Sequence, residues 1–140
     1  MKNKFEIEFS ALSQNEAFAR MCIVSFLLPR DPTVGEINDI KTAVSEAVTN
    51  CIIHGYCGRS DGTVKMCASL DENDLYIEIS DSGCGIEDIE AARKPLFTTK
   101  PECERSGMGF TVMEAFMDTL AVRSEKNIGT KVIMTKKLRG

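Results

Sequence analysis

The chain has 140 residues, 43% of them hydrophobic, which is enough for one domain with its own core spanning residues 1–140. Its 17 lysines and arginines are outnumbered by 21 aspartates and glutamates, and no segment is strongly basic, so direct nucleic-acid binding is not expected. No apolar run reaches the ~18 residues needed to cross a bilayer and no signal peptide is evident, so we expect a cytoplasmic protein that does not engage a membrane.

The N-terminal part of the chain predicts a strand followed by a helix. Apolar and charged residues alternate over residues 4–9, the pattern of a half-buried strand. Ser13 and Glu16 have capping-box spacing ahead of an apolar stretch bounded by two prolines, which predicts a helix over 14–28. Because this helix is apolar on nearly all sides, we expect it, together with the strand over 4–9, to supply homodimer and partner surfaces, with Arg20 as an exposed charge-pairing contact.

A second helix carries the first candidate site residues. Thr33 and Glu36 repeat the capping-box spacing, and apolar residues at helical intervals follow up to about His54. Glu46 and Asn50 are four residues apart on this helix and therefore share one face. The Asn50 amide oxygen, with triphosphate oxygens, could hold Mg²⁺, and Glu46 would then lie near the reacting phosphate as a possible base.

A predicted hairpin leads into the second candidate motif. Alternating runs over 64–70 and 75–79 flank a polar turn, as antiparallel strands do. Asp81, Gly83 and Gly85 then form a DxGxG turn in which the glycines let the backbone approach a flat ligand. A buried carboxylate at this turn could accept a hydrogen bond from the amine of adenine, which guanine lacks at that position. On its own, however, the motif is also compatible with an ordinary Asp-Ser-Gly turn.

The C-terminal half predicts a long loop, a helix and two strands. Residues 87–106 show no regular period, and a loop of that length in a compact domain is usually functional. A GxG sequence within 106–109 opens the third helix, from about Gly107, whose positive end suits a polyphosphate. Strands are expected over 119–124 and 130–136. A P-loop is missing, and neither GxG sequence has the third glycine of a dinucleotide-binding fingerprint.

The cysteines predict no metal centre. There are six, without CxxC spacing, and His54 is the single histidine. A zinc site needs clustered ligands, so reduced and mostly buried thiols are expected instead.

Taken in order along the chain, the motifs resemble the GHKL superfamily of ATPases and kinases. They are Glu46, Asn50 and His54 at four-residue intervals, Asp81-x-Gly83-x-Gly85, Gly107-x-Gly109, and Gly129-Thr130. The resemblance implies an α+β two-layer sandwich, the Bergerat ATP-binding fold. Its sheet would be mixed but mainly antiparallel, with helices on one face and ATP held on the helical side.

Within that superfamily, three segments are similar to the bacterial anti-sigma factor serine kinases. They are residues 45–50, 53–56 and 95–100. The resemblance implies a protein that binds a sigma factor and uses ATP and Mg²⁺ to phosphorylate a serine on an anti-anti-sigma protein. A histidine kinase would need a separate phosphoacceptor helix, and gyrase-like or chaperone-like ATPases need further domains, so neither is expected.

The same resemblance assigns roles to individual residues. Glu46 would be the general base toward the substrate serine, and Arg105 would neutralise charge on the transferring phosphoryl group. Asn50 would be the Mg²⁺ ligand, and Asp81 and Thr130 would contact adenine. The full set of expected nucleotide contacts is Asn50, Asp81, Gly83, Gly85, Thr98, Lys100, Ser106, Gly107, Met108, Gly109 and Thr130. Two alternatives stay open: an ATP-gated binding module, and a stress-response switch kinase of the same type.

Overall fold

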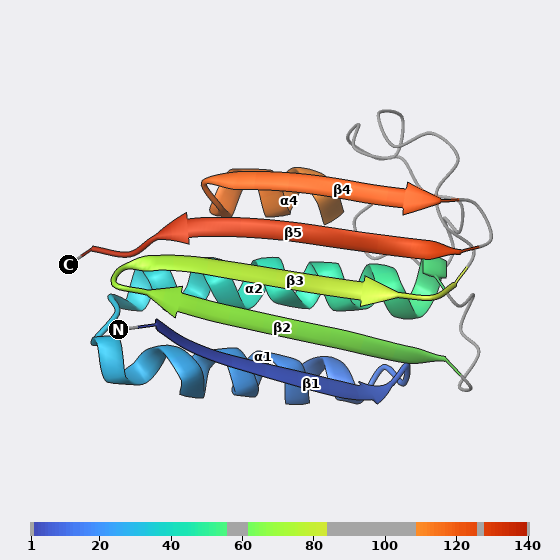
Figure 1. The fold of residues 1–140 in the computed structure, drawn as a ribbon, viewed down its shortest axis with the longest axis horizontal. Helices are drawn as coiled ribbons and strands as arrows, with labels where there is room; N and C mark the ends of the chain where they lie inside the picture. Colours follow the sequence, from blue (N-terminus) through green and yellow to red (C-terminus); the bar gives the residue numbers. More distant parts are fainter. Residues whose placement is uncertain (1, 56–61, 84–108, 126–127, 140) are drawn as a thin grey trace.

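The chain folds into an antiparallel sheet that carries its helices on one face (Figure 1). A computed structural model describes residues 2–55, 62–83, 109–125 and 128–139, the side chains of residues 54 and 55 excepted. Its elements in chain order are β1 (Lys2–Ser10), α1 (Asn15–Leu27), η1 (Leu28–Arg30), α2 (Val34–Asn50), η2 (Cys51–Gly55), β2 (Thr63–Asp71), β3 (Asp74–Asp81), α4 (Gly109–Phe116), β4 (Thr119–Glu125) and β5 (Gly129–Lys137).

The sheet has the strand order β1-β2-β3-β5-β4. The last strand of the chain, β5, therefore lies inside the sheet beside β3, and β4 forms the edge. All four pairs among the described strands are antiparallel, which confirms the α+β class but replaces the expected mixed sheet with an antiparallel one. In β3 and β5, Asp81 is directly opposite Thr130. The pairing therefore brings the DxGxG motif beside the Gly129-Thr130 motif.

The core lies between the sheet and the helices. Strand residues alternate between a buried helical face and a more exposed outer face, as the period-2 pattern predicts. The largest fully buried side chains come from both layers and are Ile23, Leu27, Ile40, Val44, Val48, Val64, Met66, Leu75, Ile77, Ile79, Met113 and Met134. This continuous apolar layer holds α2 in place against the centre of the sheet (Figure 1).

The two predicted capping boxes have different outcomes. At the start of α2, Glu36 N–H donates to Thr33 Oγ1 at 3.0 Å and Thr33 N–H donates to Glu36 Oε1 at 2.8 Å, so this capping box is confirmed. The box predicted for Ser13 and Glu16 is wrong. Its Glu16 N–H donates to the Ser13 carbonyl oxygen, and the N-cap is Gln14, which makes no side-chain capping bond.

The second helix changes its winding where the site residues are. α2 ends at Asn50, and the chain continues as a single π-helical segment, η2, up to Gly55. Turns of this kind are rare and are often associated with functional sites. η2 contacts both β3 and β5, so the widened turn lies over the part of the sheet that bears Asp81 and Thr130. In the part of the chain that the structure covers, no helix is long and apolar enough to span a membrane.

Candidate functional site

Gly109, the first described residue of α4, lies directly against polar side chains of α2. A Cβ added at Gly109 would stand 3.1 Å from Asn50 Nδ2, 3.3 Å from Asn50 Oδ1 and 3.4 Å from Glu46 Oε2. Such separations are tighter than ordinary van der Waals contact, so a residue with a side chain would press on both polar groups. The structure thus brings together Glu46, Asn50 and Gly109, which the sequence analysis selected from two separate motifs.

The second cluster surrounds Asp81 at the end of β3. Asp81 Oδ1 accepts a hydrogen bond from Gly83 N–H at 2.9 Å, which closes the DxGxG turn on itself. The backbone N–H of Thr130 and the thiol of Cys51 also donate to this carboxyl group. Burial raises the pKa of Asp81, and the three donors partly oppose that change because they favour the carboxylate.

Gly129 allows β5 to pass close to this turn. Its φ is +145°, a backbone conformation that residues with a side chain rarely adopt. A Cβ there would collide with the Asp81 carbonyl oxygen and would lie 2.9 Å from Ser82 Cα. The glycine before Thr130 is therefore required by the close approach of two backbones, and this approach sets Thr130 next to Asp81.

Cys51 joins the two clusters, and the sequence analysis did not identify it. This residue follows Asn50 in the chain, its side chain is 3% exposed, and its thiol is hydrogen-bonded to the Asp81 carboxyl group. Burial and the adjacent Asp81 carboxyl hold the pKa of the Cys51 thiol well above its usual range, so the thiol remains protonated. The only feature of the sequence that could have pointed to Cys51 was its position directly after Asn50. A buried cysteine in a helix normally packs in the core as a small apolar residue, so this position alone did not indicate a site residue.

Several expected site residues lie outside the described part of the chain. They are Gly85, Thr98, Lys100, Arg105, Ser106, Gly107 and Met108. His54 falls in η2, where the backbone alone is described. Arg20 belongs to another surface, since it lies on α1 with its Nε 3.8 Å from Glu16 Oε1. The site as described thus comprises Glu46, Asn50, Cys51, Asp81, Gly83, Gly109, Gly129 and Thr130.

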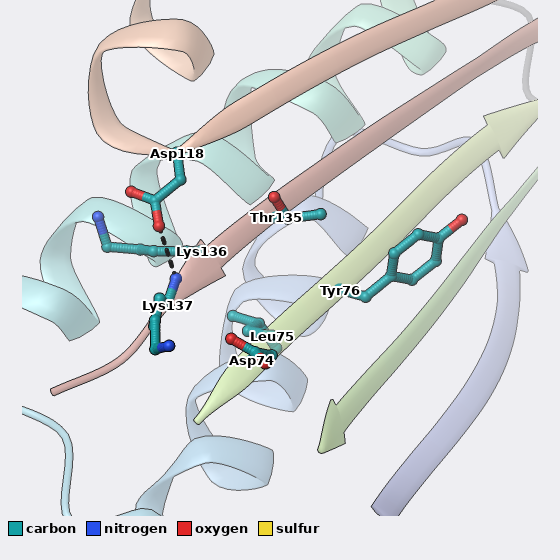
Figure 2. Close-up of a pocket in the computed structure, with 7 residues that line it drawn as sticks. All are labelled: Asp74, Leu75, Tyr76, Asp118, Thr135, Lys136 and Lys137. Atoms are coloured by element: carbon teal, nitrogen blue, oxygen red, sulfur yellow. Dashed lines mark hydrogen bonds between the residues drawn. The ribbon is translucent and has the colours of Figure 1, made fainter. Parts of the chain in front are cut away.

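A separate hollow of about 400 Å³ lies at the other end of the sheet, where β3 begins and β5 ends (Figure 2). It is lined by Asp74, Leu75, Tyr76, Asp118, Thr135, Lys136 and Lys137. Two aspartates and two lysines are among the residues that line it, and Lys137 N–H donates to Asp118 Oδ2 at 2.7 Å (Figure 2). It shares no residue with the two clusters and is not the candidate site.

The chemistry of the two clusters fits an adenine nucleotide. An ionised carboxylate offers about four lone-pair positions, and three donors bond to Asp81, so capacity for one more hydrogen bond remains. An exocyclic amine is the matching donor. At the other cluster, an amide oxygen and a carboxylate lie together beside Gly109, and these oxygen ligands suit a hard divalent cation with phosphate oxygens.

The chain is similar to known proteins over nearly all its length. Residues 9–136 match the histidine kinase-like ATPase domain family. An anti-sigma F factor of Clostridium beijerinckii is 58% identical over 135 residues, which cover 96% of this chain and 94% of that protein. The anti-sigma F factor of Bacillus subtilis is 55% identical over 138 residues, which cover 99% of this chain and 94% of that protein.

Two solved structures share the fold at low sequence identity. The crystal structure of the RsbU and RsbW domains of a Mycobacterium tuberculosis protein has a TM-score of 0.72 at 20% identity, covering 99% of this chain and 33% of that chain. The catalytic domain of histidine kinase ThkA has a TM-score of 0.57 at 15% identity, covering 95% of this chain and 97% of that domain. At these identities the likeness supports the fold and nothing finer.

Proposed function

Because this chain belongs to the anti-sigma F factors, which contain a histidine kinase-like ATPase domain, we propose that it binds a sigma factor of the sigma F type and inhibits it. We propose further that it phosphorylates a serine of its anti-anti-sigma protein with Mg·ATP. As a single cytoplasmic domain it would perform both tasks with one nucleotide site. We propose sporulation as the setting in which it acts.

The observation that carries the kinase proposal is the contact of α2 with α4. A Cβ added at Gly109 would lie 3.1–3.4 Å from the Asn50 amide and the Glu46 carboxylate, so both groups meet α4 at its first described residue. A protein that only bound nucleotide would need the amide, but it would not need a carboxylate beside it.

The proposed roles follow from the chemistry of each group. Glu46 accepts the proton of the substrate serine, which makes the hydroxyl oxygen a better nucleophile. Asn50 holds Mg²⁺, which when bound neutralises charge on the phosphate oxygens. Asp81 and Thr130 orient the adenine, and Arg105 balances charge on the transferring group.

Partner binding is proposed for the surface around α1. Phe18, Met21 and Leu28 are exposed there, at spacings that place them along one side of the helix. Exposed apolar patches of this kind mark protein contacts, and we propose a homodimer as one of them. Arg20, at the same helix, would pair with an acidic group of the sigma factor or of the anti-anti-sigma protein.

The decisive experiment separates phosphoryl transfer from binding. Glu46→Gln keeps the size of the side chain but removes the proton acceptor, so transfer to the anti-anti-sigma protein should slow by about 10²–10⁴-fold. Sigma-factor retention in gel filtration with Mg·ATP should be preserved. Asn50→Ala should lose both activities, since nucleotide binding itself is impaired.

Single-turnover transfer from labelled ATP and sigma retention should be measured on the same preparations. Glu72→Gln, in the turn between β2 and β3 at the far end of the sheet, is the matched control and should behave as wild type. Transfer at the wild-type rate by Glu46→Gln would show that another group is the base. If the wild-type protein itself transferred no phosphate, while it and Glu46→Gln both bound the two partners, the protein would be an ATP-gated binding module.

A further inference from the structure

Ser124 completes a polar row that crosses three strands of the sheet. It lies opposite Thr130 in the pair of β4 with β5, and Thr130 lies opposite Asp81 in the pair of β5 with β3. The neighbouring row toward the middle of the sheet is apolar and consists of Val122, Val132 and Ile79. Residues two apart on a strand share a face, so both rows belong to the face that the helices cover. The inner face of these strands therefore turns polar at the candidate base site.

The Ser124 hydroxyl is hydrogen-bonded to two groups of β5, and the direction of each bond follows from the number of protons. Ser124 Oγ lies 3.1 Å from the Gly129 carbonyl oxygen, which can only accept. It also lies 2.8 Å from Thr130 Oγ1, and a hydroxyl can donate or accept. A serine hydroxyl has a single proton, and here it is donated to Gly129. The Thr130 hydroxyl is therefore the donor in its bond with Ser124.

This direction decides what the Thr130 hydroxyl offers to a ligand. A threonine hydroxyl has one proton and two lone pairs, so with its proton directed to Ser124 it faces other groups as an acceptor. The Asp81 carboxylate in the same row is an acceptor as well. Two acceptors side by side match the two N–H groups of an exocyclic amine. They do not match a keto oxygen, which is itself an acceptor.

We propose that Ser124 is a positioning residue for base recognition, which accepts the hydrogen bond of the Thr130 hydroxyl and thereby holds Thr130 as a second acceptor for the adenine amine. This inference rests on the proposed adenine contacts of Asp81 and Thr130. Ser124 acts through Thr130 and needs no contact of its own with the base.

The proposal predicts a loss of discrimination between bases. In Ser124→Ala the Thr130 hydroxyl can rotate and point its proton at the adenine amine, which is also a donor. Affinity for ATP should therefore fall about twofold to tenfold, the effect of one modest hydrogen bond. Affinity for purine riboside triphosphate, which has the same phosphates and ring but no amine, should hardly change, so the ratio of the two dissociation constants should move toward one. Ser124→Thr keeps the hydroxyl and should keep the wild-type ratio.

Both nucleotides should be titrated by calorimetry in the presence of Mg²⁺, with thermal unfolding of each variant measured alongside. In a Thr130→Val background, Ser124→Ala should leave the ratio unchanged, because Ser124 acts only through the Thr130 hydroxyl. A merely structural effect of Ser124 would persist in that background. If Ser124→Ala does not fold, Ser124→Cys gives the same comparison, since a thiol is a weaker acceptor at the same position.

The chain offers a matched control on the same two strands. Thr119 and Thr135 are opposite each other in β4 and β5 and are joined through their hydroxyls, at the other end of the pair. Cross-strand hydroxyl pairs of this kind stabilise a sheet without any ligand. Thr119→Val removes the pair and should leave the nucleotide ratio at its wild-type value.

Three results would overturn the proposal: an unchanged ratio in Ser124→Ala, an equal loss for both nucleotides, or a change of ratio that persists in the Thr130→Val background. An equal loss would mean that Ser124 only stabilises the sheet. Asp81→Asn and Thr130→Val test the underlying base site separately. If neither changes the ratio, the base site itself is wrongly assigned; if they change it and Ser124→Ala does not, only the role of Ser124 is wrong. Because the titrations measure binding, their outcome does not depend on whether the protein transfers phosphate.

Discussion

Gly109 packs so closely on two polar side chains of α2 that the nucleotide site should tolerate little change there. Its Cα lies so close to Asn50 and Glu46 that a methyl group would be 3.1 Å from the Asn50 amide nitrogen. The two side chains would have to move by a few tenths of an ångström, and catalytic or ligand-binding groups lose function at such displacements. The same methyl group would favour the helix, because alanine is the better helix former by roughly 0.5–1 kcal/mol.

Gly109→Ala should therefore weaken ATP binding several-fold while the free energy of unfolding stays level or rises. Calorimetric titration and urea unfolding of the same preparation measure the two quantities. Gly35→Ala is the matched control, since a Cβ at Gly35 in the first turn of α2 would meet only Thr33 Oγ1, at 3.9 Å. ATP affinity at the wild-type level in Gly109→Ala would show that Asn50 and Glu46 move aside without consequence.

At the scale of elements, the first turn of α2 is hydrogen-bonded to the chain segment that follows the C-terminal strand. The Glu36 carboxylate is buried and accepts two backbone bonds: Oε1 from Thr33 N–H at 2.8 Å and Oε2 from Arg139 N–H at 2.7 Å. Burial by itself would raise the pKa of Glu36, but these bonds outweigh it and the pKa is lowered. Glu36 thus links the helix that carries Asn50 to the chain beyond β5.

Glu36→Gln should lower the free energy of unfolding by about 1–3 kcal/mol, because the amide nitrogen would face one of the two N–H donors. A lowered folded pKa means that this stabilisation is present above the unfolded value of about 4.3 and is lost as the pH falls through the folded value. The difference between wild type and variant in urea unfolding should accordingly shrink in acid.

The capping bond of Thr33 can be tested in the same way. Thr33→Ala should lower the free energy of unfolding by about 1 kcal/mol. Thr33→Ser, which keeps the cap, should cost little, and equal losses in the two Thr33 variants would argue against the capping bond.

At the scale of the whole molecule, the helical layer leaves an apolar surface uncovered along α1. Met21 is 61% exposed and lies between Phe18 and Leu28 on that surface. If α1 forms a homodimer contact, Met21→Glu should convert dimer to monomer in sedimentation velocity, because a charge would be buried without a partner. Ile128→Glu is the matched control. Ile128 is 62% exposed but lies in the turn between β4 and β5, and these strands are at the edge of the sheet opposite β1. Loss of the dimer in both variants, or in neither, would contradict an interface on α1.

The local patterns of the sequence were enough to predict the described strands and α-helices, but not η1, and they do not distinguish the π-helical segment η2 from the end of the second helix. Alternation identified the strands, and capping at Thr33 identified the start of α2, because both depend on residues within a few positions of one another. The Ser13 capping box failed for a local reason as well. In a capping box the serine hydroxyl accepts the hydrogen bond from the backbone N–H three residues later. Here the Glu16 N–H donates to the Ser13 backbone carbonyl oxygen instead.

The sequence by itself determined which motifs are present: an amide and a carboxylate one helical turn apart, a DxGxG turn, and a glycine before Thr130. Only the tertiary structure decided how they meet. The antiparallel pairing of β3 with β5 brings Asp81 opposite Thr130, and the packing of α4 on α2 brings Gly109 against Asn50. The bond from Cys51 to Asp81 depends on the π-helical turn lying over the sheet, and no short-range pattern encodes a contact between a helix and a strand so far apart in the chain.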